Sequence, residues 1–282
     1  MKIYFNGNYC ESYEARVSIM DRGYIFGDGI YEAFLVKNER FIDFEPHIKR
    51  LKRSLEIVNI SMPEVDKIES ITTNLLKLNS MKSALMYVQV TRGEFPTREH
   101  GMPYSNTPSV VIIAYPEREI KREWIENGIS CMLAQDIRWT RRDIKSLNLL
   151  GNVMLKQKSA DCGFDDVIFF EKDSNFVTEA SSSNVIIIKD EKLLTHPANN
   201  YILNGITKNR TMQIAKDIGI EVVEKEFIVD DLFLASSILL TSSGYRIRCC
   251  TNVDGVKINN GRICRIGRLL YNSMEKFVDG NL

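Results

Sequence analysis

Strand-like and helix-like stretches alternate along both halves of this 282-residue chain. Ile48, Leu51 and Leu55 recur at helical spacing, while short apolar runs such as 85–92 are typical of strands. Segments of both kinds in both halves predict a two-domain protein of mixed α/β content, with α+β mixed sheets. The expected helices are about 45–59, 64–78, 149–162, 207–218 and 262–277, and the expected strands are 31–36, 85–92, 109–115, 167–170, 185–188, 221–227 and 238–241.

A charged, proline-led segment separates the two halves. It reads Pro116-Glu117-Arg118-Glu119-Ile120-Lys121-Arg122-Glu123, a composition typical of an exposed linker. We therefore expect a smaller N-terminal α/β domain over 1–116, a linker over 117–123 and a larger C-terminal α/β domain over 124–282. Ligand sites often lie where two domains meet, so that region is the first place to expect one.

The charge balance gives no general attraction to nucleic acid or to an anionic membrane. Lys plus Arg and Asp plus Glu number 37 each, so any anion site must be local. The longest run without such residues, 100–116, holds three prolines and is shorter than the roughly 20 apolar residues of a membrane helix. The segment 1–7 lacks the apolar stretch of a signal peptide, and a cytoplasmic protein is expected.

The cysteines and histidines show no metal-binding pattern. The six cysteines form no C-x-x-C pair, and the three histidines have no ligand spacing with them. We expect no metal and no disulfide framework, but small buried thiols. The chain also lacks the signature motifs of phosphotransferases, zinc proteases, serine hydrolases and NAD enzymes.

Lys145 is the first candidate for chemistry. It is a lone cation before Ser146-Leu147-Asn148, and an amine becomes nucleophilic where burial favours loss of its proton. About 34 residues later, Glu179 leads into a serine-rich turn and an apolar strand. A lysine that forms a Schiff base, with an acid that pairs with a pyridinium nitrogen, is the minimal set for pyridoxal phosphate chemistry. A solvated lysine and a charge beside a strand remain the alternatives.

Three further features are candidate sites for a phosphate. Asn204-Gly205-Ile206-Thr207 precedes the expected helix from 207, and N–H groups at a helix start bind phosphate. Ser242 and Ser243 follow an apolar strand, and Arg50 lies off the apolar stripe of its helix as a possible fixed cation. An ordinary helix cap, a turn and a solvated arginine explain each feature equally well when it is taken alone.

Two loop residues and one tyrosine are candidates for binding a substrate carboxylate. Arg98 and His100 lie in the Gly/Pro-rich loop 93–108, and alternate residues of an extended segment point the same way. Tyr31 ends a glycine-rich segment and could present its phenol to a ligand. Solvent-exposed loop charges and a core aromatic are the competing interpretations.

Taken together, these segments resemble the fold-type IV (class IV) PLP-dependent aminotransferase family, and within it the D-amino-acid aminotransferases most. The resemblance covers nearly the whole chain, and the order and spacing of the segments match. The matching segments are Asp21-Arg22-Gly23-Tyr24-Ile25-Phe26-Gly27-Asp28-Gly29-Ile30-Tyr31-Glu32, Thr91-Arg92-Gly93, Asp143-Ile144-Lys145-Ser146-Leu147-Asn148-Leu149-Leu150, Thr178-Glu179-Ala180-Ser181-Ser182-Ser183-Asn184, Thr195-His196-Pro197-Ala198-Asn199-Asn200 and Gly205-Ile206-Thr207.

The resemblance implies a role for each candidate residue. Lys145 would hold pyridoxal 5'-phosphate covalently and then move the substrate proton, and Glu179 would bind the pyridine nitrogen. Arg138 would lie near the ring hydroxyl, and Leu203 would pack on the ring. The phosphate would be bound by Arg50, Ile206, Thr207, Ser242 and Ser243. The substrate carboxylate would be bound by Tyr31, Arg98 and His100.

The resemblance also implies the assembly and the reaction. It implies a homodimer with the cofactor between the two domains and with the loop of Arg98 and His100 reaching the partner subunit's site. The reaction would move the amino group of a D-amino acid of the D-alanine or D-glutamate type to a 2-oxo acid, with ping-pong kinetics. A 4-amino-4-deoxychorismate lyase and a branched-chain aminotransferase on the same fold are the alternatives. Gly244-Tyr245-Arg246 departs from the D-amino-acid pattern and leaves the side-chain preference open.

Overall fold

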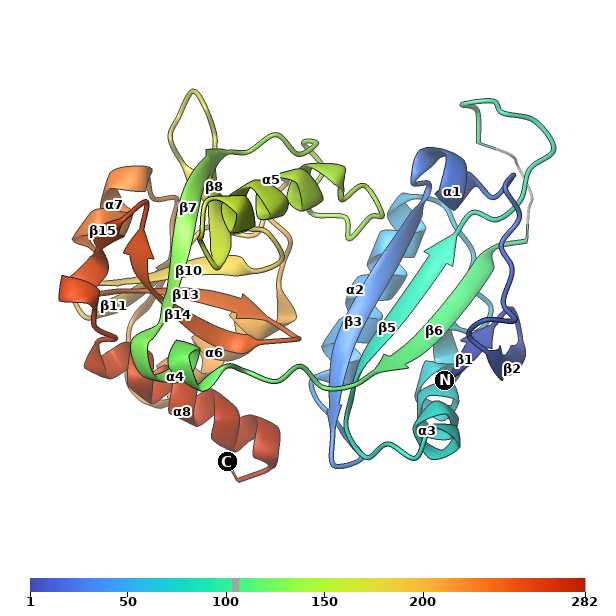
Figure 1. The fold of residues 1–282 in the computed structure, drawn as a ribbon, viewed down its shortest axis with the longest axis horizontal. Helices are drawn as coiled ribbons and strands as arrows, with labels where there is room; N and C mark the ends of the chain where they lie inside the picture. The colour runs from blue at the N-terminus through green and yellow to red at the C-terminus, as the bar shows by residue number, and fades with distance from the viewer. Residues whose placement is uncertain (103–106, 282) are drawn as a thin grey trace. The chain divides into compact units, whose positions relative to one another are not determined.

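The computed structural model describes residues 1–102 and 107–281, which form two compact units. The N-terminal unit comprises Met1–Arg118 and Ile144–Asn148, and the C-terminal unit comprises Glu119–Asp143 and Leu149–Leu282. The chain first passes from one unit to the other after Arg118, inside the charged segment 117–123 (Figure 1).

The N-terminal unit is built on a six-stranded antiparallel sheet. A hairpin forms at Asn6-Gly7, because both residues adopt the positive φ that a tight strand connection requires. The strand order is β2-β1-β6-β5-β3-β4. The strands are β1 Lys2–Phe5, β2 Asn8–Glu11, β3 Gly29–Lys37, β4 Arg40–Phe41, β5 Ala84–Thr91 and β6 Ser109–Tyr115.

Helices α2 and α3 cover one face of this sheet. Leu51 of α2 and Leu75 of α3 pack with Phe34 and Val88 in a single apolar core. Side chains alternate between the faces of a strand, so Tyr31 lies on the face opposite to Phe34. The helical segments are α1 Arg22–Phe26, α2 Phe44–Ile57, the short 3-10 helix η1 Val65–Lys67 and α3 Ile68–Leu78.

Lys145 belongs to the N-terminal unit, although we expected it in a C-terminal domain over 124–282. The main-chain N–H of Tyr31 donates to the carbonyl of Lys145 at 2.9 Å, and Leu147 donates to Gly29 at 3.1 Å. The segment Ile144–Asn148 approaches β3 so closely that a Cβ at Gly29 would lie 2.8 Å from Leu147 Cδ1. Lys145 lies in the N-terminal unit because its segment forms main-chain hydrogen bonds with β3. The local sequence pattern carries no signal of this pairing.

The C-terminal unit is a nine-stranded mixed sheet that closes on itself. Its order is β12-β11-β10-β13-β14-β7-β8-β9, and β15 pairs with β14. Pairing of Asn184 with Glu179 joins β10 to β9, so the strands from β10 through β14 and β7 to β9 form a closed ring. The strands are β7 Ile129–Gln135, β8 Asp166–Phe170, β9 Val177–Ala180, β10 Asn184–Lys189, β11 Lys192–Thr195, β12 Val222–Glu224, β13 Ser237–Ser242, β14 Arg246–Val253 and β15 Val256–Lys257.

Every helix expected in the second half forms, and two short α-helices and one 3-10 helix are added. Apolar strand residues such as Val185, Ile187 and Leu240 make the core that these elements surround. The expected strand 221–227 is shorter, because only β12 pairs with a neighbour. The helices are α4 Arg122–Asn127, α5 Leu150–Asp161, α6 Ile206–Asp217, α7 Val229–Leu234, the 3-10 helix η2 Ile258–Gly261 and α8 Arg265–Asp279.

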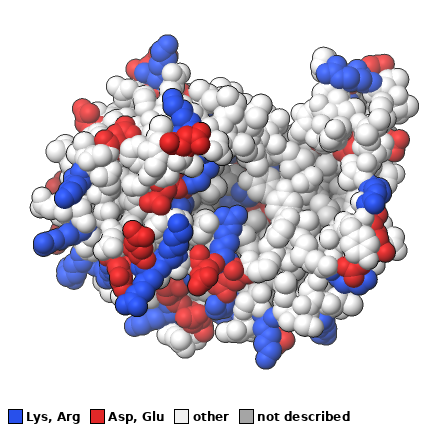
Figure 2. Space-filling view, in the orientation of Figure 1, with Lys and Arg blue, Asp and Glu red and all other residues white. Residues whose placement is uncertain are grey.

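The surface carries both signs of charge. Figure 2 shows lysines and arginines interspersed with aspartates and glutamates on the face drawn, as the equal counts suggest. Within residues 1–102 and 107–281, no helix combines the length and the apolar character that crossing a membrane requires.

Candidate active site

The Lys145 amine lies against an aromatic side chain of β3. Its Nζ is 4.3 Å from the centroid of the Tyr31 ring, and both side chains are only half-buried. Tyr31 in turn packs on Tyr87, whose hydroxyl donates to Gln89 at 2.7 Å. Burial raises the pKa of Tyr87, so this phenol remains a neutral donor. The predicted pair Lys145 and Tyr31 is therefore brought together within the N-terminal unit.

Arg50 forms a buried ion pair on the helix-covered face of the same sheet. Its Nε and Nη2 donate to the Glu32 carboxylate at 2.8 and 2.7 Å, and His47 Nδ1 lies 3.1 Å from the same group. Burial opposes ionisation of Glu32, but Arg50 and His47 outweigh it and lower the pKa of this carboxyl. Glu32 thus fixes the orientation of the guanidinium, an anchor that the sequence did not reveal.

Arg98 and His100 are exposed and lie beside the same phenylalanine. The Arg98 guanidinium is 5.1 Å from the centroid of the Phe26 ring, and the His100 ring is 5.5 Å from it. In the described part of the chain, neither side chain forms a hydrogen bond, ion pair or ring contact with Tyr31. The structure therefore brings the two loop residues together on Phe26 and leaves Tyr31 apart from them.

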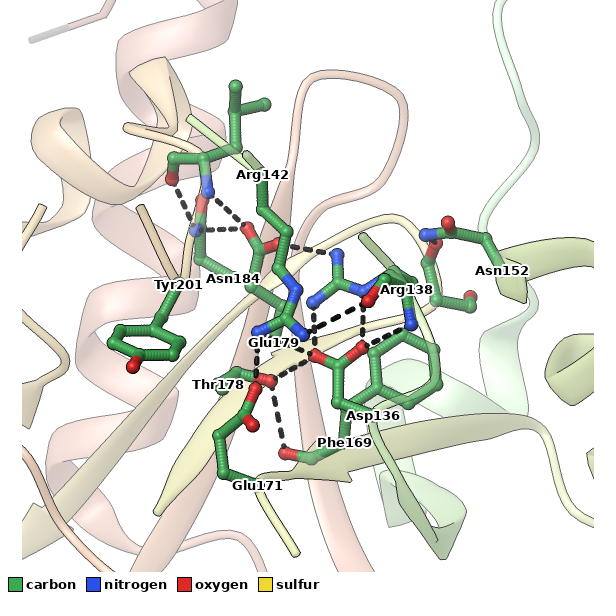
Figure 3. A network of polar contacts seen from close by, with 12 residues as sticks. Asp136, Arg138, Arg142, Asn152, Phe169, Glu171, Thr178, Glu179, Asn184 and Tyr201 are labelled. Carbon is green, nitrogen blue, oxygen red and sulfur yellow. Dashed lines mark hydrogen bonds and ion pairs between the residues drawn. The ribbon is translucent and has the colours of Figure 1, made fainter. Parts of the chain in front are cut away.

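Glu179 is the centre of a buried polar network in the C-terminal unit (Figure 3). Its Oε1 accepts hydrogen bonds from Asn184 Nδ2 and from the main-chain N–H of Leu203, both at 2.9 Å. Its Oε2 accepts from Arg138 Nη1 at 2.7 Å. A carboxylate offers about four acceptor positions, so one position on Oε2 remains for a further donor.

Arg138 connects Glu179 to a second buried acid. Its Nε and Nη2 donate to Asp136 at 2.9 and 2.7 Å, and its guanidinium lies 4.8 Å from the centroid of the Phe169 ring. Burial opposes the charge on Arg138, but Glu179 and Asp136 outweigh it and raise its pKa. The structure thus places Arg138 between two carboxylates, an arrangement that the sequence expectation of a ring-hydroxyl contact did not include.

Asp136 is held by three donors. Besides Arg138, Thr178 Oγ1 donates to it at 2.7 Å and Arg142 Nη1 lies 3.4 Å away. Burial opposes ionisation, but Arg138, Arg142 and Thr178 together lower the pKa of Asp136. Sequence reasoning assigned no role to Asp136 or Arg142, although the segment 136–143 is dense in charge. Their signal was charge without apolar periodicity.

Asn184 joins the carboxylate network to both predicted phosphate turns. Asn184 on β10 faces Thr241 on β13, and Thr241 directly precedes Ser242 and Ser243. It also touches Gly205, since a Cβ there would lie 1.8 Å from Asn184 Oδ1. Sequence reasoning missed Asn184, although it directly follows the serine-rich turn.

The first turn of α6 is open to an anion. Gly205 is the residue before the helix and provides no side-chain cap, so no N-cap side chain occupies the N–H groups of the first turn. Ile206 is buried, and Thr207, Ser242 and Ser243 are half-buried. Thr241 Oγ1 is buried and has no hydrogen-bond partner among the described residues. Asn184 therefore lies beside both Gly205, which precedes this turn, and Thr241, which precedes Ser242 and Ser243, while the phosphate-binding role of these residues stays a prediction.

Comparison with known proteins identifies the family. The model of the family "Amino-transferase class IV" matches residues 29–253. A D-alanine aminotransferase of Staphylococcus aureus (strain MSSA476) is 37% identical over 99% of both chains. One from Bacillus licheniformis is 38% identical over 93% of this chain and 91% of its own.

Solved structures show the same fold at lower sequence identity. The Escherichia coli branched-chain amino acid aminotransferase superposes with a TM-score of 0.93 at 22% identity, covering 99% of this chain and 95% of its own. A PLP-bound hypothetical aminotransferase from Mycobacterium tuberculosis gives a TM-score of 0.86 at 20% identity and covers both chains completely. The expected mixed α/β fold is confirmed, and the chain belongs to the class IV aminotransferase family.

Proposed function

We propose that the protein is a D-amino-acid aminotransferase that moves an amino group from a D-amino acid to a 2-oxo acid. Class IV aminotransferases use pyridoxal 5'-phosphate, and this is the cofactor of the chain. The observation that carries the proposal is the similarity to D-alanine aminotransferases, which runs over 99% of both chains. D-Alanine and D-glutamate are the proposed class of donors.

The residues of the C-terminal unit fit this cofactor. Glu179 keeps one acceptor position on Oε2 for a protonated ring nitrogen, because its other contacts come from Arg138, Asn184 and Leu203. The open first turn of α6 provides N–H donors for a phosphate. We propose Arg50, Ile206, Thr207, Ser242 and Ser243 as the phosphate-binding residues, with Leu203 packing on the ring and Arg138 near the ring hydroxyl.

Lys145 would supply the nucleophile and the base. We propose that its amine would hold the cofactor covalently and, when free, would accept the proton from the substrate Cα. When bound, the cofactor supplies an electron sink for the charge that develops at that carbon. The amine lies 4.3 Å from the centroid of the Tyr31 ring, beside a residue that we propose to bind the substrate.

Arg98, His100 and Tyr31 would bind the substrate carboxylate. The Arg98 guanidinium stacks on Phe26 and forms no hydrogen bond within residues 1–102 and 107–281, so its planar donor edge is available to a carboxylate. An Arg-x-His pair of this kind favours a D-amino acid over the substrates of the two alternatives, the branched-chain aminotransferase and the 4-amino-4-deoxychorismate lyase.

Mixing the purified, cofactor-loaded protein with D-alanine and 2-oxoglutarate tests the function. We expect pyruvate and D-glutamate in equal amounts, with parallel lines in double-reciprocal plots because the two substrates bind in turn. L-Alanine and L-leucine serve as controls. Amino transfer from L-leucine instead would favour the branched-chain alternative, and pyruvate release from 4-amino-4-deoxychorismate without a 2-oxo acid would favour the lyase.

We also propose a homodimer in the cytoplasm, in which the loop of Arg98 and His100 reaches the partner subunit's site. Leu150, Val153 and Met154 on α5 are each more than half exposed, and such apolar side chains support a subunit interface. Sedimentation at several protein concentrations tests the dimer. A single species at the mass of one chain would contradict it.

A further inference from the structure

We propose that Arg22 and Phe26 are positioning residues that fix the segment carrying Arg98 and His100 and so determine how well carboxylate substrates bind. The inference rests on the proposed function, because it assumes that these two side chains meet the substrate carboxylate. It adds two residues that would act on the substrate without touching it.

Arg22 holds the main chain of this segment. Its Nη1 donates to the carbonyl of Glu99 at 2.6 Å, and its Nη2 donates to the carbonyl of His100 at 3.4 Å. The Arg22 side chain is only 4% exposed, so the donor side of these bonds is shielded from water. Because a charged donor strengthens both bonds and both acceptors are backbone atoms, Arg22 fixes the path of the chain itself.

Asp28 sets the orientation of the Arg22 fork. The Nε of Arg22 donates to Asp28 Oδ2 at 2.8 Å, which turns the two terminal nitrogens toward the loop. Arg92 binds the same carboxylate at 2.7 and 3.0 Å, and donates separately to the carbonyls of Asn59 and Val58. Burial opposes ionisation of Asp28, but Arg92 and Arg22 outweigh it and lower its pKa. The acceptor for Arg22 Nε is therefore itself fixed.

Phe26 contacts the side chains of the same segment. Its ring centroid is 5.1 Å from the Arg98 guanidinium and 5.5 Å from the His100 ring. The Arg22 guanidinium lies 4.8 Å from the same centroid. Contact between a guanidinium and an aromatic face is attractive, and it reduces the number of conformations open to an exposed arginine. One ring thus orders both side chains and their anchor.

Helix α1 is itself a fixed platform for these two residues. Asp21 accepts from the N–H of Gly23 at 2.7 Å and from Thr91 Oγ1 at 2.9 Å, which ties the helix start to the end of β5. A Cβ at Gly23 would lie only 2.2 Å from Thr91 Cγ2. Arg22 and Phe26 are four residues apart, so they lie on the same side of this short helix.

The consequence is that the carboxylate-binding side chains are ordered before a substrate arrives. Arg98 and His100 are exposed, and without support each would lose conformational freedom when a ligand bound. Arg22 holds the backbone of both residues, and Phe26 holds the Arg98 guanidinium and the His100 ring. This support removes part of the conformational entropy lost on binding. The effect should therefore fall on substrate affinity and not on the chemistry at Lys145.

A matched pair of arginine variants tests the inference. Arg22→Lys and Arg92→Lys each keep a cation beside Asp28 and each lose contacts to two carbonyls, but only Arg22 has its carbonyls in the loop. We expect Arg22→Lys to raise KM for D-alanine by roughly tenfold with kcat changed less than about threefold. Both variants should lower the thermal midpoint by a similar amount, but Arg92→Lys should leave KM nearly unchanged.

Two further variants keep the test decisive if Arg22→Lys folds poorly. Phe26→Leu should raise KM by about fivefold, and Phe26→Tyr, which keeps the ring, should restore it. In a background that carries both Arg98→Ala and His100→Ala, Phe26→Leu should change KM by less than about twofold, because both side chains that it orders are absent.

Each outcome bears on one claim. A wild-type protein that transfers no amino group from D-alanine overturns the proposed function. A wild-type protein that is active, with a KM raised by Arg98→Ala but unchanged by Arg22→Lys and Phe26→Leu, overturns the positioning role alone. Equal KM changes in Arg22→Lys and Arg92→Lys would also overturn it, since they would indicate a general loss of order.

Discussion

The C-terminal unit keeps its candidate functional charges buried and paired, whereas the N-terminal unit, apart from the buried Arg50, presents its own exposed or half-buried. Glu179 and Asp136 are 6% and 7% exposed, and each accepts several hydrogen bonds. Arg98 and His100 are exposed, and Lys145 lies half-buried against an aromatic ring.

The difference follows from the cost of burying a charge. A buried carboxylate must be paired, so its position is fixed before any ligand arrives. Such a network suits a cofactor that stays bound. Groups that bind a changing substrate need donors that no other residue occupies. In the N-terminal unit, Arg22 bonds the main chain of the loop and Phe26 contacts the Arg98 guanidinium on its face, so the polar edge of Arg98 stays available.

Replacing the half-buried amine should have the largest effect on activity. We expect Lys145→Ala to lower kcat by at least about 10⁴-fold, because both the covalent attachment and the base are lost. Its thermal midpoint should change little, since the segment is held by main-chain bonds. Borohydride reduction of the cofactor-loaded protein followed by peptide mapping should label Lys145 in the wild type.

Lys121→Ala is the matched control, because Lys121 Nζ also lies over a ring, 4.9 Å from Trp124. It should keep both full activity and the label. A wild-type protein labelled at another lysine would contradict the assignment of the amine.

Removing one charge from the buried network should have a smaller effect. We expect Glu179→Gln to lower kcat by about 10²–10³-fold, because an amide does not keep a ring nitrogen protonated. Asp136 still pairs with Arg138, so the fold should persist. The measurements are single-turnover rates with D-alanine and the absorption spectrum of the bound cofactor. Wild-type rates in this variant would show that the carboxylate charge is not used.

The smallest effect should appear in the pH dependence of stability. The pKa of Asp136 is lowered in the folded protein, so its ionised form stabilises the fold above the ordinary pKa near 4 and this contribution fades as pH falls through the folded value. We expect Asp136→Asn to lower the thermal midpoint by about 4–10 °C at pH 7. The gap to wild type should narrow toward pH 3. A gap that is constant between pH 7 and pH 3 would contradict this.

Several elements could be predicted because their signal is local. The apolar stripe of Ile48, Leu51 and Leu55 predicted α2, and the apolar runs predicted β5 and β13 within two residues at each end. Strand β14 was missed, since it carries Arg246 and Arg248 on a run that is buried except at Asn252. Those charges are tolerated because Glu275 and Asp166 pair with them, and the partners are far away in sequence.

The sequence by itself determined the family and the mixed α/β content, and it predicted roles for Lys145 and Glu179, because residue type and order along the chain carry those signals. Only the tertiary structure decided that Lys145 packs with the N-terminal sheet, that Asn184 joins Glu179 to Gly205 and Thr241, and that Arg22 supports the loop of Arg98. Hydrogen bonds between residues distant in sequence depend on three-dimensional geometry, which no local pattern encodes.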